Sequence, residues 1–553
     1  MTQQRRTRSV TRHLAGTIVA LALVAFSLAA WAGQPNDAFP VSYNMRRIGH
    51  TDLNGRTAYQ PTLHTIGGRV YLFVGHFAGT IPVGLPNAGL VNGGTSIVDV
   101  TDPDDPKFVT FLPSNAHAPS TGGSQMVRVC DGGVIGSAGR AYMLRNTSNT
   151  HEVWDVTNPA QPQFASVIRP AANAVFTNTH KNWWECDTGI AYIVAGAGTA
   201  SAAPDGWKTN QHIKVYDLRD PSSPVYIRDI GLVGQNPGSS VTTATGGVHG
   251  PISIHNNPRN SSDAVNRIYV PYGTSSNGVF QILDRQKVLP TTLGGTWNPA
   301  SSTSPHPDTN PTDDDLRSLV VGSMDMTPTE GAHTSFPIFG VPLKHYQGFT
   351  DATTRDLVAL ISEEVDNHCQ GAPHFGYLVD ATRTAFTAAG GASAGENHPM
   401  VISTMQVADN SAKPDFCTRG TRFGTHSTNE SFYAPYYGKL LFIAYFDGGL
   451  RVFDIRDPYR PKNVAYFIPN VTKNTQATNV TINGVVQQFF DVSSDNAEVD
   501  DRGYIYVVDR VGGGADILKL TGDAREVVDG DKDKDDHDRD DDHDRGHDHD
   551  RDH

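Results

Sequence analysis

Four segments of this chain repeat one short pattern, and this repetition constrains the fold more than any other feature. Each copy follows D-[VLI]-[TR]-[DN]-P-x-x-P after a short apolar stretch. A pattern that recurs in register indicates an architecture built from one repeated supersecondary unit. The copies are SIVDVTDPDDP (Ser96–Pro106), HEVWDVTNPAQP (His151–Pro162), IKVYDLRDPSSP (Ile213–Pro224) and LRVFDIRDPYRP (Leu450–Pro461).

The unit around each copy is predicted to consist of β-strands. In the first unit, HTIGGRVYLFVGH (His64–His76), TSIVDV (Thr95–Val100) and KFVTFLP (Lys107–Pro113) alternate with period two and are rich in β-branched and aromatic residues, as half-buried strands are. Asp-Pro or Asn-Pro fixes the turn, because the acidic side chain caps it and proline presets φ. The seven predicted units begin near His64, Ser120, Val175, Thr245, Gly331, Gly424 and Ser494.

The seventh unit ends near Leu520 without an outer strand, and the segment VSYNMRRIG (Val41–Gly49) resembles the missing one. A ring of four-stranded blades closed in this way hides its exposed strand edges. We therefore predict an all-β fold, a seven-bladed β-propeller closed by an N-terminal strand, with six or eight blades as alternatives. The insertions Pro290–Thr329 and Ala388–Phe416 are rich in Gly, Ser, Thr and Pro and are predicted to be surface loops.

The N-terminal segment is predicted to be a secretory signal peptide over residues 1–32. Its first residues are basic, Leu14–Ala30 is apolar, and Ala30-Trp31-Ala32 forms a small-x-small cleavage site. An uncleaved anchor helix is the alternative, although the apolar run is short for a membrane span. We predict an exported protein, periplasmic or extracellular, with no integral membrane segment after signal removal.

The C-terminal segment, residues 529–553, consists almost entirely of Asp, His, Arg and Lys and is predicted to be disordered, which leaves residues 33–528 for the propeller. It is either a solvating tail or a weak cation-binding segment, since Asp oxygens suit Ca²⁺ and His nitrogens suit Zn²⁺ or Cu²⁺. The tail supplies much of the formal net charge of −14, so the acidity says little about the folded part. The folded part has no basic run, which argues against nucleic acid as a partner.

The chain has four cysteines, and in an exported protein a small even number favours disulfides. VCDGG and ECDTG lie at matching places in consecutive units, which predicts the pair Cys130–Cys186. The remaining pair is then Cys369–Cys417.

The repeats resemble those of the LVIVD-repeat proteins, a family of β-propellers. The resemblance rests on the four D-[VLI]-[TR]-[DN]-P-x-x-P copies and covers roughly residues 41–520. It implies the propeller architecture and says little about activity, because a propeller is a scaffold for many functions.

A polar residue recurs just before the first strand of most units, and in five units it is a histidine. The second unit has Gln125 at this place, and the seventh has Asn496 or Glu498. Because the innermost strands of a propeller run along its central channel, these side chains are expected near the axis at one mouth. The five histidines are His64, His180, His249, His333 and His426.

Two interpretations of these histidines stay open. Each ring can bond to the backbone of the neighbouring blade and hold the blades together. Alternatively, three or four of them bind a transition metal, since neutral imidazole suits Cu, Fe, Zn and Ni; copper is favoured only by the second resemblance given below. Carboxylates would then orient the rings from a second shell. The second-shell or reserve candidates are Gln125, Glu364, His368, Glu430 and Glu498.

Two functions fit this sequence. The repeats and histidines are distantly similar to the selenium-binding protein/methanethiol oxidase propellers, which implies a copper-dependent oxidoreductase acting on a small molecule. A redox-inert Mn²⁺ or Zn²⁺ lyase or hydrolase fits the same ligands. The alternative is a non-catalytic, exported binding propeller for a protein partner, with a cation-binding tail. No free cysteine remains once both pairs form, which puts the substrate class of the first function in question.

Overall fold

The structure, a computed structural model, describes residues 41–117, 120, 122–169, 176–197, 206–298, 310–343, 354–388, 391–407 and 416–529. The predicted signal peptide and residues 530–553 of the predicted tail lie outside these ranges. Asp529 is the last residue of helix α4 (Gly522–Asp529). Within the described part of the chain, no helix is long and apolar enough to cross a membrane.

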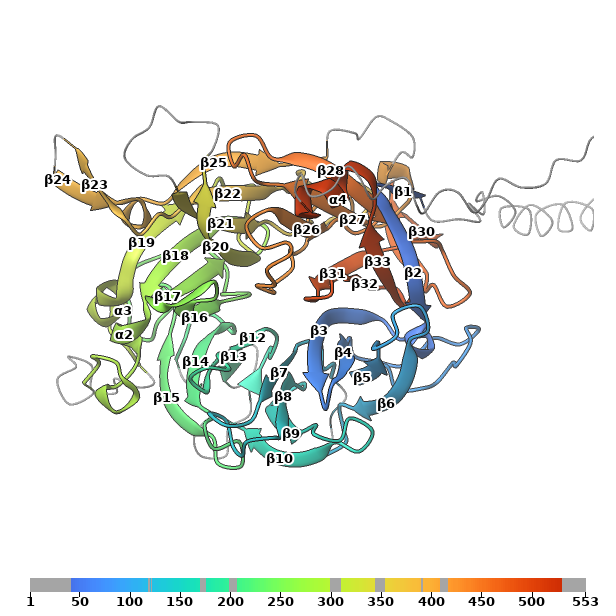
Figure 1. Cartoon of the computed structure of the whole chain (residues 1–553), viewed down its shortest axis with the longest axis horizontal. Coiled ribbons are helices and arrows are strands. Elements are labelled where there is room, and N and C mark those ends of the chain that lie inside the picture. The colour runs from blue at the N-terminus through green and yellow to red at the C-terminus, as the bar shows by residue number, and fades with distance from the viewer. Residues whose placement is uncertain are drawn as a thin grey trace, which may run out of the picture. The chain divides into compact units, whose positions relative to one another are not determined.

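Seven antiparallel sheets surround a central axis, which confirms the seven-bladed β-propeller (Figure 1). The first three blades, with the strand nearest the axis first, are β3 (Ala58–Ile66), β4 (Arg69–His76), β5 (Gly94–Asp99), β6 (Lys107–Pro113); β7 (Val127–Asp131), β8 (Ala141–Asn146), β9 (His151–Asp155), β10 (Gln163–Ile168); and β11 (Phe176–Thr177) with β12 (Asn182–Trp184), β13 (Ile190–Ala197), β14 (His212–Asp217), β15 (Val225–Ile230).

The other four blades include the two strands at the N-terminus. They are β16 (Ile252–Asn257), β17 (Asn260–Tyr272), β18 (Val279–Asp284), β19 (Val320–Asp325); β20 (Thr334–Pro342), β21 (Thr354–Ile361), β22 (Gly376–Asp380), β25 (Met400–Met405); β26 (Leu440–Ala444), β27 (Leu450–Asp454), β28 (Lys462–Ile468), β1 (Val41–Tyr43); and β31 (Ser494–Val499), β32 (Ile505–Asp509), β33 (Ala515–Leu520), β2 (Met45–Thr51).

The N-terminal segment closes the ring as predicted, because β2 pairs with β33 and completes the seventh blade. It also does something that the sequence did not indicate: β1 pairs with β28, the outer strand of the sixth blade. One continuous segment therefore joins the last two blades and covers the outer edge of each, which removes two open strand edges.

The repeated aspartate ends its strand by capping the turn that follows. Its carboxylate accepts a hydrogen bond from the backbone N–H two residues later, at 2.9 to 3.0 Å, in Asp99, Asp155, Asp217 and Asp454. Asp284 and Asp380 make the same contact in the fourth and fifth blades, which lack the paired prolines. The carboxylate cap, rather than the proline pair, is thus the more general feature of the unit.

The prediction that both long insertions are loops was wrong in part. The first contains helix α3 (Asp313–Leu319) and β19, and the second contains β25. These two strands are the outer strands of the fourth and fifth blades. In both blades a long insertion separates the third strand from the outer strand. The regular sequence spacing of the repeat is therefore lost in these two blades.

The short elements lie between or at the edges of the blades. They are α2 (Arg285–Val288), the 3-10 turns η1 (Leu53–Gly55), η2 (Thr291–Leu293), η4 (Gly395–Asn397) and η5 (Phe416–Thr418), and the hairpins β23 (Ala385–Ala388) with β24 (Gly391–Ala394) and β29 (Thr478–Ile482) with β30 (Val485–Phe489).

Both predicted disulfides are present. Cys130 is bonded to Cys186, which links the second and third blades, and Cys369 is bonded to Cys417. Two disulfides fit a protein that folds in an oxidising compartment.

Candidate functional site

Four of the five predicted histidines meet on the propeller axis. They enter from four consecutive blades: His180 precedes β12, His249 precedes β16, His333 precedes β20, and His426 precedes β26. Successive ring centroids are 4.5, 3.8 and 4.5 Å apart along this order. Nε2 of His180 lies 2.8 Å from Nε2 of His249. These four residues are called the axial histidine cluster below.

His64, the fifth predicted ligand, is not in this cluster. Its Nε2 lies 2.9 Å from Oδ1 of Asp131 instead. The first blade contributes Tyr59, whose hydroxyl is 3.2 Å from Nε2 of His180 and whose ring centroid is 5.5 Å from that of His426. A strand rises about 3.3 Å per residue, so the five positions between Tyr59 and His64 correspond to about 16 Å along β3.

A buried carboxylate, Glu363, faces the cluster from the end of β21. Its Oε2 lies 3.7 Å from Nε2 of His333, and its Oε1 lies 3.8 Å from Nε2 of His426. Arg422 holds this carboxylate in place at 2.8 Å. Ligand atoms of His249, His333 and Glu363 all lie within 4.8 Å of one another, close enough for the three side chains to hold one metal ion.

The hydrogen bonds fix which nitrogen of His426 carries a lone pair. Its Nδ1 lies 2.5 Å from the backbone carbonyl oxygen of Asp495, which only accepts, so Nδ1 donates. In the neutral ring, Nε2 is then an acceptor, and it points toward the acceptor oxygens of Glu363. Nε2 of His333 and Nδ1 of His249 are both buried and have no hydrogen-bond partner among the described residues.

Burial keeps the cluster neutral. It lowers the pKa of His180 to about 3 and the pKa values of the other three imidazoles well below the ordinary value of 6.5. The positive charge of Lys181 also lowers the pKa of each of the four imidazoles. Lys181 is 1% exposed and pairs with Glu430 at 3.6 Å. Neutral imidazole is the form that binds a metal ion.

The donor set fits a transition metal. Zinc–nitrogen bonds are about 2.0–2.1 Å and zinc–oxygen bonds about 2.0–2.2 Å long, so two ligand atoms of one ion lie at most about 4.2 Å apart. The contacts of Glu363 with His333 and His426 already lie within that span. Imidazole nitrogens with one carboxylate suit Zn, Cu, Fe and Ni.

The reserve residues lie outside this arrangement. Gln125 is half-buried ahead of β7, and His368 packs on Phe489 with ring centroids 5.6 Å apart. Glu364 is buried, and burial raises its pKa to about 7, while its Oε1 accepts the backbone N–H of Asp366. None of these three belongs to the His/Glu site found among the described residues.

Glu430 and Glu498 lie further along the axis than the histidines. Glu430 forms ion pairs with Arg128 and Lys181. Glu498 accepts the backbone N–H of Glu430 at 2.9 Å. Glu430 therefore acts on the cluster through Lys181, whose charge it offsets.

A polar pocket of about 350 Å³ lies at the channel mouth where the innermost strands begin. Arg422 and Arg510 line it and lie above the cluster, since Arg422 pairs with Glu363 and Arg510 pairs with Asp495 at 3.0 Å. Their side chains are 23% and 27% exposed. Two partly exposed guanidinium groups therefore lie between this pocket and the acidic residues beside the cluster.

Sequence reasoning missed Tyr59, Lys181 and Arg422. Near the channel end of the fifth unit, the segment EEVDNHC places Glu363 beside Glu364 and His368, and the latter two were selected as candidates instead of Glu363. Lys181 could have been found from the sequence, because it directly follows His180 in NTHKN. The repeat pattern does not distinguish Glu363 from Glu364, because both follow the second strand of the blade rather than preceding the first.

The fold and the site together define a β-propeller with a His/Glu cluster on its axis and two disulfides. No family model matches the chain, and no curated protein matches it. Among solved structures, the chain is similar to the propeller of Dos1, with 11% sequence identity and a TM-score of 0.41, over 87% of this chain and 96% of that chain. This likeness concerns the fold alone.

Proposed function

We propose that the axial histidine cluster binds a transition metal ion, with copper favoured, and that the protein is an exported oxidoreductase acting on a small molecule. The observation that carries this proposal is the run of four adjacent imidazoles at the axis, with ligand atoms of His249, His333 and Glu363 within 4.8 Å of one another. Structural histidines that join neighbouring blades would bond to backbone. His426 does so through the Asp495 carbonyl, whereas His180 and His249 are joined ring to ring by their Nε2 atoms at 2.8 Å.

Copper is favoured because imidazole-rich sites bind divalent copper more tightly than the other first-row metals. Bound copper would supply one-electron chemistry. The protein's own groups would then orient the reaction: the Tyr59 hydroxyl lies 3.2 Å from Nε2 of His180, and the Glu363 carboxylate lies beside two imidazoles. Arg422 and Arg510 at the mouth favour a substrate that carries negative charge.

Export is supported by the two disulfides and by the signal-like N-terminal sequence. The resemblance of the repeats to LVIVD-repeat proteins supports the propeller architecture. The more distant resemblance to the selenium-binding protein/methanethiol oxidase propellers supports a copper-dependent function. The Asp/His-rich tail is proposed as a separate, weaker cation-binding segment, with Ca²⁺ or a transition metal as its ligand.

The test is elemental analysis of the full-length protein, purified without a histidine tag and dialysed against EDTA. The wild type and His64→Ala, whose ring lies outside the cluster, are expected to retain about one equivalent of metal. His249→Ala/His333→Ala should retain none. Because all three proteins carry the same tail, metal bound there cancels in the comparison.

Equal metal content in the three proteins would refute the site. If none of them retains metal and the double variant is only less stable, the protein is the non-catalytic binding propeller. Loss of metal only from the double variant leads to oxidase assays with small anionic substrates.

A further inference from the structure

The polar pocket at the channel mouth, of about 350 Å³, has basic residues but no acidic residue among the described residues that line it. Arg422 and Arg510 supply its charges, and the rest of the described lining is uncharged, with threonine, asparagine, glutamine and serine in the majority. The pocket therefore presents positive charge and neutral hydrogen-bonding groups to anything that enters it.

The acidic partners of the two arginines lie behind the guanidinium groups. Glu363 pairs with Nη1 of Arg422 at 2.8 Å, and Asp495 pairs with Nη1 of Arg510 at 3.0 Å. Glu363 is 8% exposed and Asp495 is fully buried, whereas both arginine side chains are partly exposed and line the pocket. Each pair is thus neutral as a whole, but its positive end faces the pocket and its negative end faces the interior.

Each guanidinium group also keeps one edge open. The side-chain hydrogen bonds of Arg422 and Arg510 to described residues all leave from Nη1. The edge formed by Nε and Nη2 is the one that can bind a carboxylate or phosphate through two parallel hydrogen bonds. Aromatic rings hold both groups in place, since Arg510 lies 4.5 Å from the ring centroid of Phe77 and Arg422 lies 5.3 Å from that of Phe446. Two arginines fixed in this way are preorganised for an oxyanion.

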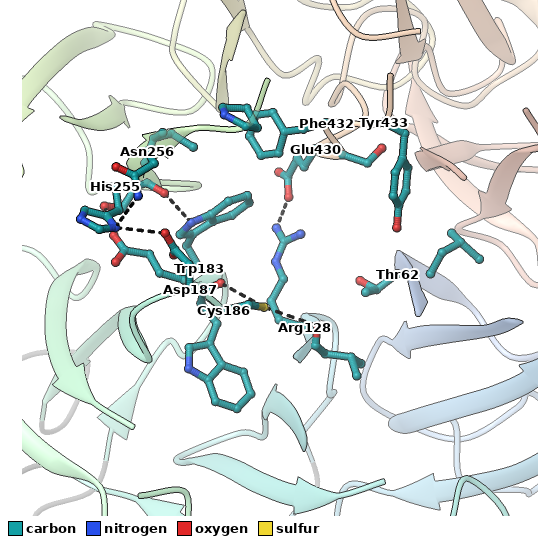
Figure 2. A pocket seen from close by; sticks show the side chains of 18 of the residues that line it. Thr62, Arg128, Trp183, Cys186, Asp187, His255, Asn256, Glu430, Phe432 and Tyr433 are labelled. Carbon is teal, nitrogen blue, oxygen red and sulfur yellow. Dashed lines mark hydrogen bonds and ion pairs between the residues drawn. The ribbon is translucent and has the colours of Figure 1, made fainter. Parts of the chain in front are cut away.

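The larger pocket, of about 560 Å³, has the opposite character. Its lining includes Glu430 and Glu498, which lie further along the axis than the histidines, and also Glu185 and Asp187. Arg128, which lines it too, is already paired with Glu430 (Figure 2). A small anion is therefore expected in the polar pocket and not in the larger one.

We propose that the polar pocket binds a small organic oxyanion. Its carboxylate or phosphate group accepts hydrogen bonds from the open edges of Arg422 and Arg510, and its uncharged part lies among the hydroxyl and amide groups of the lining. A volume of about 350 Å³ is within the range of small-molecule sites. The identity of this anion as the substrate of the metal centre rests on the proposed function, because Glu363 contacts both the axial histidine cluster and Arg422.

The test is isothermal titration calorimetry of the full-length protein at low ionic strength. The protein is dialysed against EDTA and then against metal-free buffer without chelator, because EDTA is itself an anion that would compete for the pocket. The probes are malate, glycerol 3-phosphate and the neutral glycerol. One or both anions should bind about tenfold or more tightly than glycerol, since hydrogen bonds to arginine are charge-assisted. The tighter of the two anions identifies whether the pocket recognises a carboxylate or a phosphate.

Thr80, an exposed residue of the lining, allows a matched pair of variants. Thr80→Asp places a carboxylate at the pocket and should weaken anion binding about tenfold or more, whereas the uncharged Thr80→Asn should change it by less than about twofold. Arg510→Gln should also weaken the anion. Arg456→Gln, which removes an exposed arginine outside the pocket, should not. Thr80→Asp keeps the test decisive if Arg510→Gln fails to fold, because an exposed position tolerates the change.

No binding of either anion, equal affinities for the anions and glycerol, or full anion affinity in Thr80→Asp would overturn the proposal. Unchanged anion binding is expected in His249→Ala/His333→Ala, because none of the axial histidines lines the pocket. Failure of the metal site and failure of the anion pocket are therefore separate results.

Discussion

The Glu498 carboxyl should make the stability of the propeller depend on pH. Burial raises its pKa from 4.5 to about 7, with the nearby Glu430 charge as a smaller cause. The unfolded chain therefore loses this proton near pH 4.5, while the folded chain keeps it until about pH 7. Stability from this group is fully present below pH 4.5 and is lost as the pH rises through 7.

The magnitude follows from the size of the shift. One pKa unit corresponds to about 1.4 kcal/mol. Ionisation of Glu498 therefore lowers the free energy of unfolding by about 3 kcal/mol at pH 9 and by less than about 1 kcal/mol at pH 5. Glu498→Gln removes the titration and keeps the oxygen that accepts the Glu430 N–H. The variant should therefore be more stable than the wild type by about 3 kcal/mol at pH 9 and nearly equal to it at pH 5.

Urea unfolding followed by tryptophan fluorescence at both pH values measures this difference. The entropy of unfolding is about 2 cal/mol/K per residue, so in a propeller of this size the gain corresponds to about 3 °C in Tm at pH 9. Glu526→Gln, which is exposed, should show no such pH dependence. A stability difference between Glu498→Gln and wild type that is the same at pH 5 and pH 9 would refute the reasoning.

Three further predictions concern other parts of the molecule. Cys130→Ser/Cys186→Ser should lower the free energy of unfolding by about 4 kcal/mol in urea titrations, because the bond closes a loop of 56 residues; an unchanged midpoint after reduction of the wild type would contradict this. Arg145→Met should lower the free energy of unfolding by at least about 3 kcal/mol, since it leaves the buried Glu152 without its ion-pair partner. Adding Glu152→Gln should recover most of that loss. A double variant no more stable than the single variant would contradict this prediction. Glu363→Gln should reduce metal retention against EDTA, whereas Glu364→Gln, its neighbour outside the cluster, should not; equal losses in the two variants would contradict the assigned ligand.

Most of the fold was predictable because each repeat carries its own turn. The aspartate at the end of the third strand of the blade accepts a hydrogen bond from the backbone N–H two residues later. A local sequence pattern therefore fixes where that strand stops. The same logic failed for β19 and β25, which follow long insertions and have no paired prolines ahead of them. The pairing of β1 with β28 also could not be predicted from the sequence, because a strand added at a sheet edge requires no particular residue in its partner strand.

The site was predictable where histidine marked the start of the innermost strand. In the first blade the strand begins at Ala58, so the position facing the axis is Tyr59, and the register shift between Ala58 and Pro61 hides this offset. His64 lies too far along the same strand. Glu363 and Arg422 reach the axis from connecting segments, whose course depends on tertiary packing rather than on the repeat.

The spacing of Glu363 from the histidines indicates what the site is built to hold. Separations of 3.7 and 3.8 Å are too long for a direct hydrogen bond, which ends near 3.2 Å. A water molecule that donates to both atoms at about 2.8 Å with a near-tetrahedral angle spans about 4.4 Å, which is too long. A metal ion with bonds of about 2.1 Å spans about 3.4 Å at a tetrahedral angle and at most 4.2 Å, on the order of the observed separations. These separations support the metal site proposed above, in which Glu363 rather than a fifth histidine would supply the remaining ligand.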